Sequence, residues 1–222
     1  MTNNAPIVHK TRTQVVLEVI RERILSGDIK AGSPLRQSAL ASELNVSRIP
    51  IREALLQLEA EGLVTFEPHK GATAAKLSTE QVQELFELRA LIETDLLAKS
   101  IANMTEANIE TAQQILTQLE DAFNQPNSSA TWSDLNTAFH TSLYQAANKP
   151  STMEIVQNLN TNCDRYIRLH LLHIGGIPKA EKQHQQLLAC CRLGDVKGAC
   201  DILKEHILGS AADIIKLVEQ QS

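Results

Sequence analysis

The sequence predicts a mainly α-helical fold in two parts: a small N-terminal unit that ends in a β-hairpin, and an all-helical C-terminal bundle. Aromatic residues make up only 3% of the 222 residues, which argues against a β-sandwich or β-barrel. The chain is rich in Ala, Leu, Ile, Gln and Glu, which favour helix. With 43% apolar and 21% charged residues, it has the composition of an ordinary globular protein with a buried core.

The N-terminal unit, residues 1–76, reads as helix, short helix, turn, helix and hairpin. The first helix is expected over residues 11–26, with an inward face made by Val15, Val16, Val19, Ile20 and Ile24. Ser38 and Ser47 are the expected N-caps of the next two helices, and Pro50 lies in the first turn of the second. Two short alternating runs follow and predict a β-hairpin. This order of elements is that of a winged helix-turn-helix.

The C-terminal unit, residues 77–222, reads as helical throughout. Ser78 and Gln81 resemble a capping box at the start of its first helix. Six amphipathic helices are expected, over about 79–103, 105–124, 131–147, 151–174, 179–193 and 195–220. The connections between them are short, which predicts an antiparallel bundle.

The net charge of −5 is unevenly distributed between these two parts. Residues 1–76 carry 10 Lys and Arg against 8 Asp and Glu, whereas residues 77–222 carry 11 against 18. An acidic protein can still bind nucleic acid where its positive charge is local. The sequence shows no leader pattern and no apolar run long enough to cross a membrane. The four cysteines lack metal or redox spacing, so we expect reduced thiols and a cytoplasmic protein.

Basic residues of the N-terminal unit lie where a helix-turn-helix meets DNA. Arg48 and Arg52 share one face of its second helix, and an arginine can bind guanine through two hydrogen bonds. Other candidate DNA contacts are Arg36 before the first helix of the pair, the Ser47 hydroxyl, and the hairpin tip of His69, Lys70 and Gly71. Surface arginines also occur in proteins that bind no DNA, and Arg52 has possible ion-pair partners in Glu53 and Glu59.

Histidines gather in the acidic helical half of the chain. Asn136 and His140 lie four residues apart on one helix face, and His184 and His206 lie beside apolar residues on two later helices. Three imidazoles that converge in a bundle point to a divalent metal. The residues alone leave a second interpretation open, in which these are separate core or surface histidines.

The run LASELNVSRIPIREALLQLEAEGLV resembles the signature of the GntR family of bacterial transcription regulators. The resemblance covers residues 11–76 and implies a DNA-binding winged helix-turn-helix. Ile49 is a departure, because the family usually has Thr there; a hydroxyl contact at this position is therefore in doubt.

The helices from residue 79 resemble the FadR-like subgroup, whose effector-binding domain is the all-helical FCD bundle. The resemblance implies a divalent metal held by Asn136, His140, His184 and His206, with zinc or nickel favoured and manganese possible. Asn136 replaces a frequent Asp, which removes one negative charge and predicts weaker binding. Arg89 matches the family's arginine that faces the same cavity, and Arg165 and Arg168 are candidates to extend a carboxylate site.

The expected function is therefore a transcription regulator, more often a repressor in this family, that binds a palindromic operator as a homodimer. A small carboxylate effector is expected to modulate operator binding. Two alternatives stay open: a metal-dependent enzyme acting on a small organic acid, and a direct metal sensor. No catalytic residue is assigned, because Glu181 and Glu205 flank two of the histidines in sequence and so point elsewhere on their helices.

Overall fold

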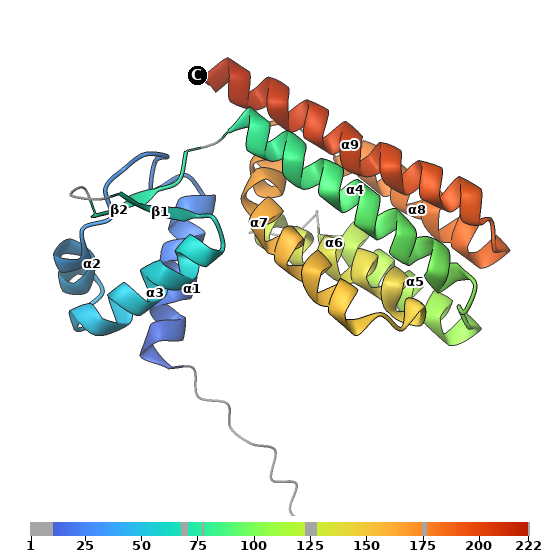
Figure 1. The fold of residues 1–222 in the computed structure, drawn as a ribbon, viewed down its shortest axis with the longest axis horizontal. Helices are drawn as coiled ribbons and strands as arrows, with labels where there is room; N and C mark the ends of the chain where they lie inside the picture. Colours follow the sequence, from blue (N-terminus) through green and yellow to red (C-terminus); the bar gives the residue numbers. More distant parts are fainter. Residues whose placement is uncertain (1–10, 68–70, 77, 123–127, 175–176, 222) are drawn as a thin grey trace, which may run out of the picture. The chain divides into compact units, whose positions relative to one another are not determined.

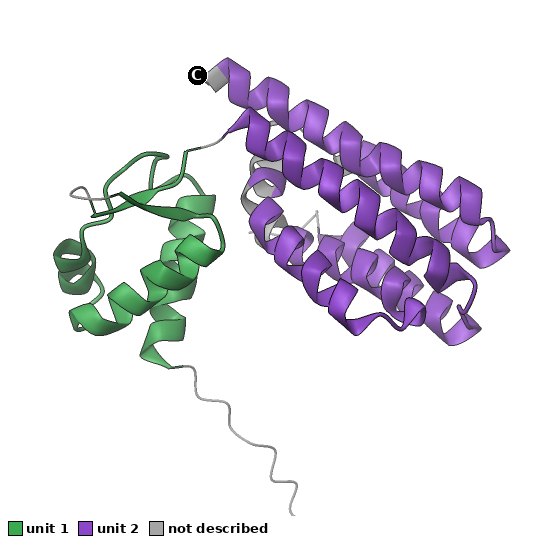
Figure 2. Ribbon diagram, viewed as in Figure 1, with its two compact units in different colours: residues 1–76 green, residues 77–222 purple. Residues whose placement is uncertain are grey.

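The computed structural model of the chain describes residues 11–67, 71–76, 78–122, 128–174 and 177–221; within these ranges the side chains of 128–130, 165, 168–174, 177 and 221 lie outside the description. The chain forms two compact units, residues 1–76 and residues 77–222 (Figure 2). Each unit has its own buried apolar core.

The first unit contains three helices and a two-stranded sheet (Figure 1). Its elements are α1 (Arg12–Leu25), α2 (Gln37–Glu43), α3 (Arg48–Ala60), β1 (Val64–Glu67) and β2 (Gly71–Ala74). The strands pair antiparallel, with Val64 opposite Ala74 and Glu67 opposite Gly71. A further bridge joins Pro34 to Thr73, so the segment before α2 also lies along the sheet. The winged helix-turn-helix order expected from the sequence is confirmed.

Two details of this unit differ from the sequence expectation. Val15 is 47% exposed, and Leu17 takes its place beside Val16 and Ile20 in the core. Helix α2 begins at Gln37 after an extended Arg36, so Ser38 lies inside the helix and is not its N-cap. In α1, packing against the core decides which of the apolar side chains are buried; at α2, the backbone N–H of Leu40 donates to the carbonyl of Arg36, so the first helical turn closes before the expected cap.

Helix α3 is held by its apolar face. Ile51, Ala54, Leu55 and Leu58 are all fully buried, as their spacing predicts. The helix begins after Ser47, as expected, although the Ser47 side chain makes no capping hydrogen bond. Because one face of α3 fits the core so completely, the opposite face of the helix is presented to solvent.

The second unit is a bundle of helices, with one short 3₁₀ turn, in the residues that the structure describes (Figure 1). Its elements are α4 (Thr79–Ile101), α5 (Glu106–Ala122), α6 (Ser128–Tyr144), η1 (Gln145–Ala147), α7 (Pro150–Ile174), α8 (Ile177–Leu193) and α9 (Val196–Gln221). The helices expected from the sequence are present, with their ends shifted by a few residues. The described part of the chain contains no helix long and apolar enough to span a membrane.

Helix α4 organises the bundle. The Ser78 hydroxyl accepts a hydrogen bond from the Gln81 backbone N–H at its start, which is the cap expected from the sequence. Helices α4 and α9 lie side by side and run in opposite directions, and α4 also packs on α6 and α7 (Figure 1). Alongside its apolar residues, α4 buries two charged ones, Arg89 and Glu93, at the centre of the bundle.

Candidate metal centre and DNA-binding surface

Three histidines from three helices meet inside the bundle. His140 comes from α6, His184 from α8 and His206 from α9, and all three are buried. Their ring centroids are 4.7 to 5.2 Å apart. One nitrogen from each ring lies within 4.8 Å of the other two. Imidazole nitrogens gathered from separate helices in this way form a donor set suited to a divalent transition metal.

Several polar atoms of this cluster have unmet hydrogen-bonding capacity. Among the described residues, Oδ1 of Asn136, Nε2 of His140 and both ring nitrogens of His184 are buried and have no hydrogen-bond partner. Buried polar atoms nearly always have a partner, because leaving them without one is costly. Asn136 lies one turn before His140 on α6, so its oxygen comes from the same helix as the first imidazole. Neutral nitrogen and oxygen donors of this kind fit a divalent cation.

Burial keeps these imidazoles neutral. It lowers the pKa of His140 well below the usual value of 6.5, and the neighbouring His184, His206 and Arg89 lower it further. Burial and the nearby His206 likewise hold the pKa of His184 well below 6.5. Both rings are therefore uncharged at neutral pH, which is the form that binds a metal.

A second layer of contacts orients two of the rings. The Tyr144 hydroxyl donates a hydrogen bond of 2.7 Å to Oε2 of Glu93, and it lies 3.5 Å from Nδ1 of His140. Gln183 Oε1 lies 3.1 Å from Nδ1 of His206. A hydrogen-bond partner at Nδ1 leaves Nε2 as the ligand atom. For His140, Nε2 is the ring nitrogen that has no partner.

Arg89 lies beside the cluster and is fixed by a buried ion pair. Its Nε donates a hydrogen bond of 2.7 Å to Oε1 of Glu93, four residues later on α4. The guanidinium carbon also lies 5.3 Å from the centroid of the Phe86 ring. Burial lowers the pKa of Arg89, but the Glu93 carboxylate, together with the nearby Cys163 and Tyr144, outweighs this and raises the pKa above its usual value. Arg89 is therefore a permanent cation.

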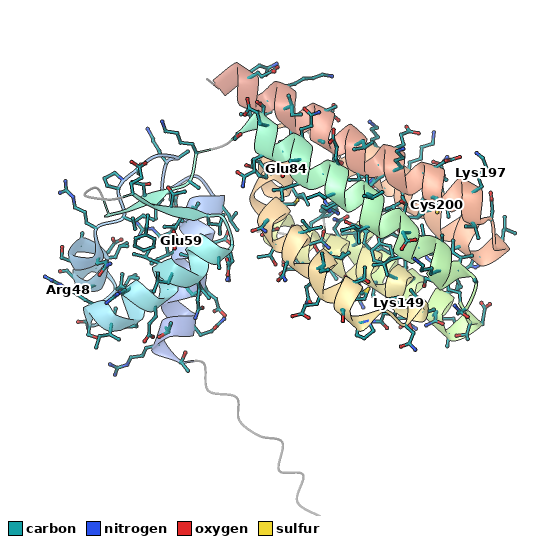
Figure 3. All side chains as sticks on the ribbon, in the orientation of Figure 1. Arg48, Glu59, Glu84, Lys149, Lys197 and Cys200 are labelled. Carbon is teal, nitrogen blue, oxygen red and sulfur yellow. The ribbon has the colours of Figure 1, made fainter. Side chains whose placement is uncertain are left out.

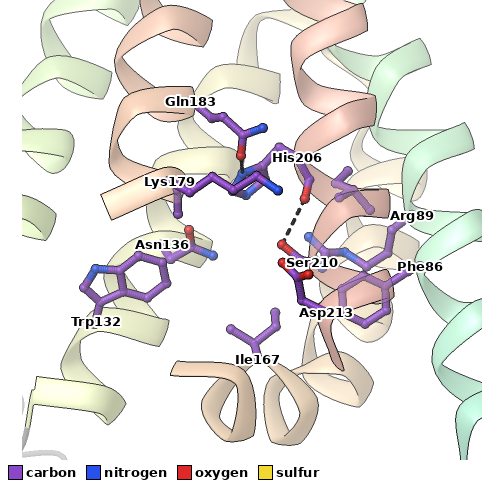
Figure 4. A pocket seen from close by; sticks show the side chains of 12 residues that line it. Phe86, Arg89, Trp132, Asn136, Ile167, Lys179, Gln183, His206, Ser210 and Asp213 are labelled. Carbon is purple, nitrogen blue, oxygen red and sulfur yellow. Dashed lines mark hydrogen bonds between the residues drawn. The ribbon is translucent and has the colours of Figure 1, made fainter. Parts of the chain in front are cut away.

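A pocket opens beside these residues (Figure 4). It is lined by the cations Arg89 and Lys179, by the carboxylate of Asp213, and by neutral polar and apolar side chains: Asn136, Gln183, His206, Ser210, Phe86, Trp132, Ile167, Ala180 and Ile207. Asn136 and His206 belong both to the pocket and to the metal candidate set, and Arg89 reaches the same space. A small anion in this pocket would thus meet a guanidinium and the donor cluster together.

The sequence did not single out some of the residues that shape this site. Glu93, Tyr144, Lys179, Gln183 and Asp213 were missed. Two of them carried a readable signal: Glu93 lies four residues after Arg89, and Tyr144 lies four residues after His140, so each shares a helix face with a predicted site residue. Arg165 and Arg168 lie on α7, but their side chains are outside the described part of the structure.

The predicted DNA contacts in the first unit lie on its surface. Arg36, Ser47, Arg48, Arg52 and Gly71 are all exposed. Figure 3 shows the Arg48 side chain extending from the N-terminal end of α3. Within the described residues, neither arginine of α3 forms an ion pair, and Glu53 instead accepts a hydrogen bond of 2.7 Å from Thr13. The guanidiniums of α3 therefore keep their donors for another partner; His69 and Lys70 fall outside the described residues.

Both units match models of known protein families. Residues 12–73 match the model described as bacterial regulatory proteins of the gntR family, and residues 84–209 match that of the FCD domain. The HTH-type transcriptional repressor GlaR of Escherichia coli (strain K12) is 28% identical over 196 residues, which cover 85% of this chain and 89% of GlaR.

Solved structures give the same result. A GntR-family transcriptional regulator from Pseudomonas syringae pv. tomato str. DC3000 is 31% identical with a TM-score of 0.56, covering 94% of this chain and 88% of its own. The structure of E. coli McbR/YncC is 22% identical with a TM-score of 0.73, covering 96% of this chain and 99% of its own. At that lower identity, the second likeness shows the fold alone.

The lowered pKa values predict how the metal-free protein responds to acid. In the unfolded chain a histidine takes up a proton near pH 6.5, whereas buried His140 and His184 stay neutral to lower pH. Below about pH 6.5 the unfolded state therefore binds more protons, so we expect the free energy of unfolding to fall as pH falls, by up to about 1.4 kcal/mol per pH unit for each histidine. The emission of Trp132, the only tryptophan, reports unfolding of the bundle in chelator-treated protein.

The matched variant is His184→Gln, which removes one of the two groups and should flatten this dependence. Gln186→Ala, an exposed change two residues away on α8, should leave it as in the wild type. A pH dependence that is the same in all three proteins would contradict the assignment.

Proposed function

The chain belongs to the GntR family of bacterial transcription regulators with an FCD domain and is therefore a DNA-binding regulator, and we propose that it is a repressor controlled by a small carboxylate. This carboxylate would bind at a metal centre in the helical bundle. The observation that carries this proposal is the cluster of three buried histidines beside the buried cation Arg89. Repression is proposed because GlaR, a relative across most of the chain, is named a transcriptional repressor.

Asn136, His140, His184 and His206 are the residues proposed to hold the metal. All four supply neutral donor atoms, and imidazole-rich sites suit zinc or nickel, with manganese also possible. A divalent ion bound by neutral ligands would keep its full positive charge and so supply strong attraction for an anion. Proteins that this bundle resembles often have aspartate where this chain has Asn136. The neutral amide lowers the negative charge around the ion, which would weaken metal binding but strengthen the attraction of the ion for an anion.

Arg89 is the residue proposed to bind the effector's carboxylate. Because its Nε already donates to Glu93, the two terminal amino groups are the donors left for a ligand. A pair of parallel hydrogen bonds to a carboxylate is the geometry that a guanidinium favours. Lys179 lines the same pocket and adds a second positive charge, while Asp213 in the same lining adds a negative one. Arg165 and Arg168 on α7 remain proposed contributors to the site.

The first unit is proposed to read DNA with α3 in the major groove. Arg48 and Arg52 would bind base edges, Arg36 and Ser47 would bind phosphates, and the hairpin tip of His69, Lys70 and Gly71 would enter the minor groove. One α3 helix offers few base contacts, so a homodimer on a palindromic operator is part of the proposal.

Two other functions were raised by the histidine cluster. An enzyme is not supported, because the relatives are named transcriptional regulators. A direct metal sensor shares the same residues as the proposed carboxylate sensor. The two differ in one measurement: metal alone would change the DNA affinity of a metal sensor, whereas the proposed regulator needs a carboxylate as well.

We expect Arg48→Ala and Arg52→Ala each to weaken binding to a specific operator by about 1–3 kcal/mol and to relax base preference. The reason is loss of a two-donor contact to a base, and the measurement is a titration of the full-length protein against specific and random duplexes. Arg192→Ala, an exposed arginine on α8, is the control and should change neither. If both α3 variants kept full specificity, the proposal that α3 contacts the bases of the operator would be ruled out.

We expect His184→Gln to lose the bound metal, because it removes one of the three imidazoles. Elemental analysis of gently purified protein measures this directly, with Gln186→Ala, an exposed change two residues away on α8, as the control. The wild type should also melt at a higher temperature with metal than without, since a ligand that binds only the folded state stabilises it. Equal metal content in the wild type and in a His140, His184 and His206 triple alanine variant would refute the site.

Arg89 is best tested by Arg89→Lys, because Arg89→Ala would leave the Glu93 carboxylate buried without its cation. Lysine keeps the charge but loses the fork of donors. We therefore expect retained metal but about tenfold or weaker binding of the best carboxylate found in a thermal-shift screen of the wild type. Lys182→Ala, exposed on α8 and outside the pocket lining, should bind that carboxylate normally. Unchanged affinity in Arg89→Lys would exclude the proposed role.

A further inference from the structure

An exposed isoleucine stands among the candidate DNA contacts of α3. The Ile49 side chain is 69% exposed, and in the described residues of the first unit the other exposed large apolar side chains, Val15 and Leu56, reach only 47% and 48%. Ile49 is flanked by Arg48 and lies one turn before Arg52, and both arginines are exposed too. The residue has no donor or acceptor in its side chain, so it cannot make the hydroxyl contact that a threonine would make.

The direction of Ile49 follows from the way α3 packs. Successive residues turn by about 100° around a helix. The buried residues Ile51, Ala54, Leu55 and Leu58 centre on one side of α3, and by this rotation Ile49 lies roughly opposite that centre. Ile49 is also the second residue of the helix, and helical side chains lean toward the N-terminus. It therefore projects from the end of α3 that would enter the major groove.

Within the major groove, the largest apolar group that base pairs offer to such a side chain is the C5-methyl of thymine. Apart from small C–H edges such as C5–H of cytosine, the other groups on the base edges there are hydrogen-bond donors or acceptors, which an isoleucine would desolvate without replacing their bonds. Isoleucine in a helix is also held mainly in one χ1 rotamer, so little conformational freedom is lost when it packs against a methyl.

We propose that Ile49 is a specificity-determining residue that selects thymine, through its methyl group, in each half of the operator. This inference rests on the proposed insertion of α3 into the major groove. Helix α3 rises about 1.5 Å per residue, so the selected thymine should lie within about two base pairs of the bases read by Arg48 and Arg52.

The test combines a change in the protein with the loss of one methyl group from the DNA. Full-length wild-type protein is used to enrich binding sites from a random duplex library. Each thymine of the enriched site is then replaced in turn by deoxyuridine, which pairs in the same way but lacks the methyl. Wild type and Ile49→Ala are titrated against every duplex, and Leu56→Ala, on the same face about two turns further along, is the control.

We expect one thymine in each half-site at which deoxyuridine weakens wild-type binding about three- to tenfold, the size expected for burying a methyl group. At that position Ile49→Ala should bind the thymine and deoxyuridine duplexes equally, whereas Leu56→Ala should discriminate like the wild type.

The inference is overturned if no thymine replacement affects the wild type more than Ile49→Ala. Arg48→Ala and Arg52→Ala, taken through the same enrichment, separate this result from failure of the proposed DNA reading. Altered sites for the arginine variants with an unaltered site for Ile49→Ala would refute only the role of Ile49. Sites unaltered by all three substitutions, or no enrichment by the wild type, would refute the insertion of α3 itself.

Discussion

The buried carboxylate of Glu93 is the constraint on which the centre of the bundle depends. The residue has no exposed surface, and burying a charge without compensation costs several kcal/mol or more. Compensation comes from Nε of Arg89 on the same helix and from the hydroxyl of Tyr144, which lies 51 residues further along the chain at the end of α6. The hydrogen-bonding needs of the buried carboxylate are met by Arg89 and Tyr144 only while both donors are in place, so it fixes the position of α6 against α4.

This constraint extends outward in two directions. Tyr144 lies one turn after His140 and within 3.5 Å of Nδ1 of that ring, and Arg89 lines the pocket. The same carboxylate thus holds both the proposed anion-binding cation and one of the proposed metal ligands. It also cancels part of the field of Arg89, and the Asp213 carboxylate in the pocket lining opposes the charge of Lys179, so in the proposed function the positive potential of the pocket depends on a bound metal. Metal and carboxylate would then bind cooperatively.

The sequence predicted what periodicity and spacing encode. The order of helices and hairpin and the buried face of α3 followed from residues a fixed number of positions apart on single helices, whereas the meeting of the three histidines, which lie on three helices, was implied by the resemblance to the FCD bundle. Contacts set by packing did not follow: Leu17 rather than Val15 faces the core, and Arg36 rather than Ser38 precedes α2. The Tyr144–Glu93 and His206–Gln183 contacts join different helices, and their partners become neighbours only when the bundle is assembled.

Stability alone does not account for the polar centre of this bundle. The cluster is surrounded by fully buried apolar side chains, among them Phe139, whose ring centroid lies 5.0 Å from that of His184. Apolar residues of similar volume in place of buried polar ones are often neutral or stabilising. Unpartnered atoms of Asn136, His140 and His184 therefore oppose folding until something binds them. A ligand that satisfies these atoms would stabilise only the arrangement in which the helices hold them together, and in the proposed function this is how occupancy of the site would control helix packing.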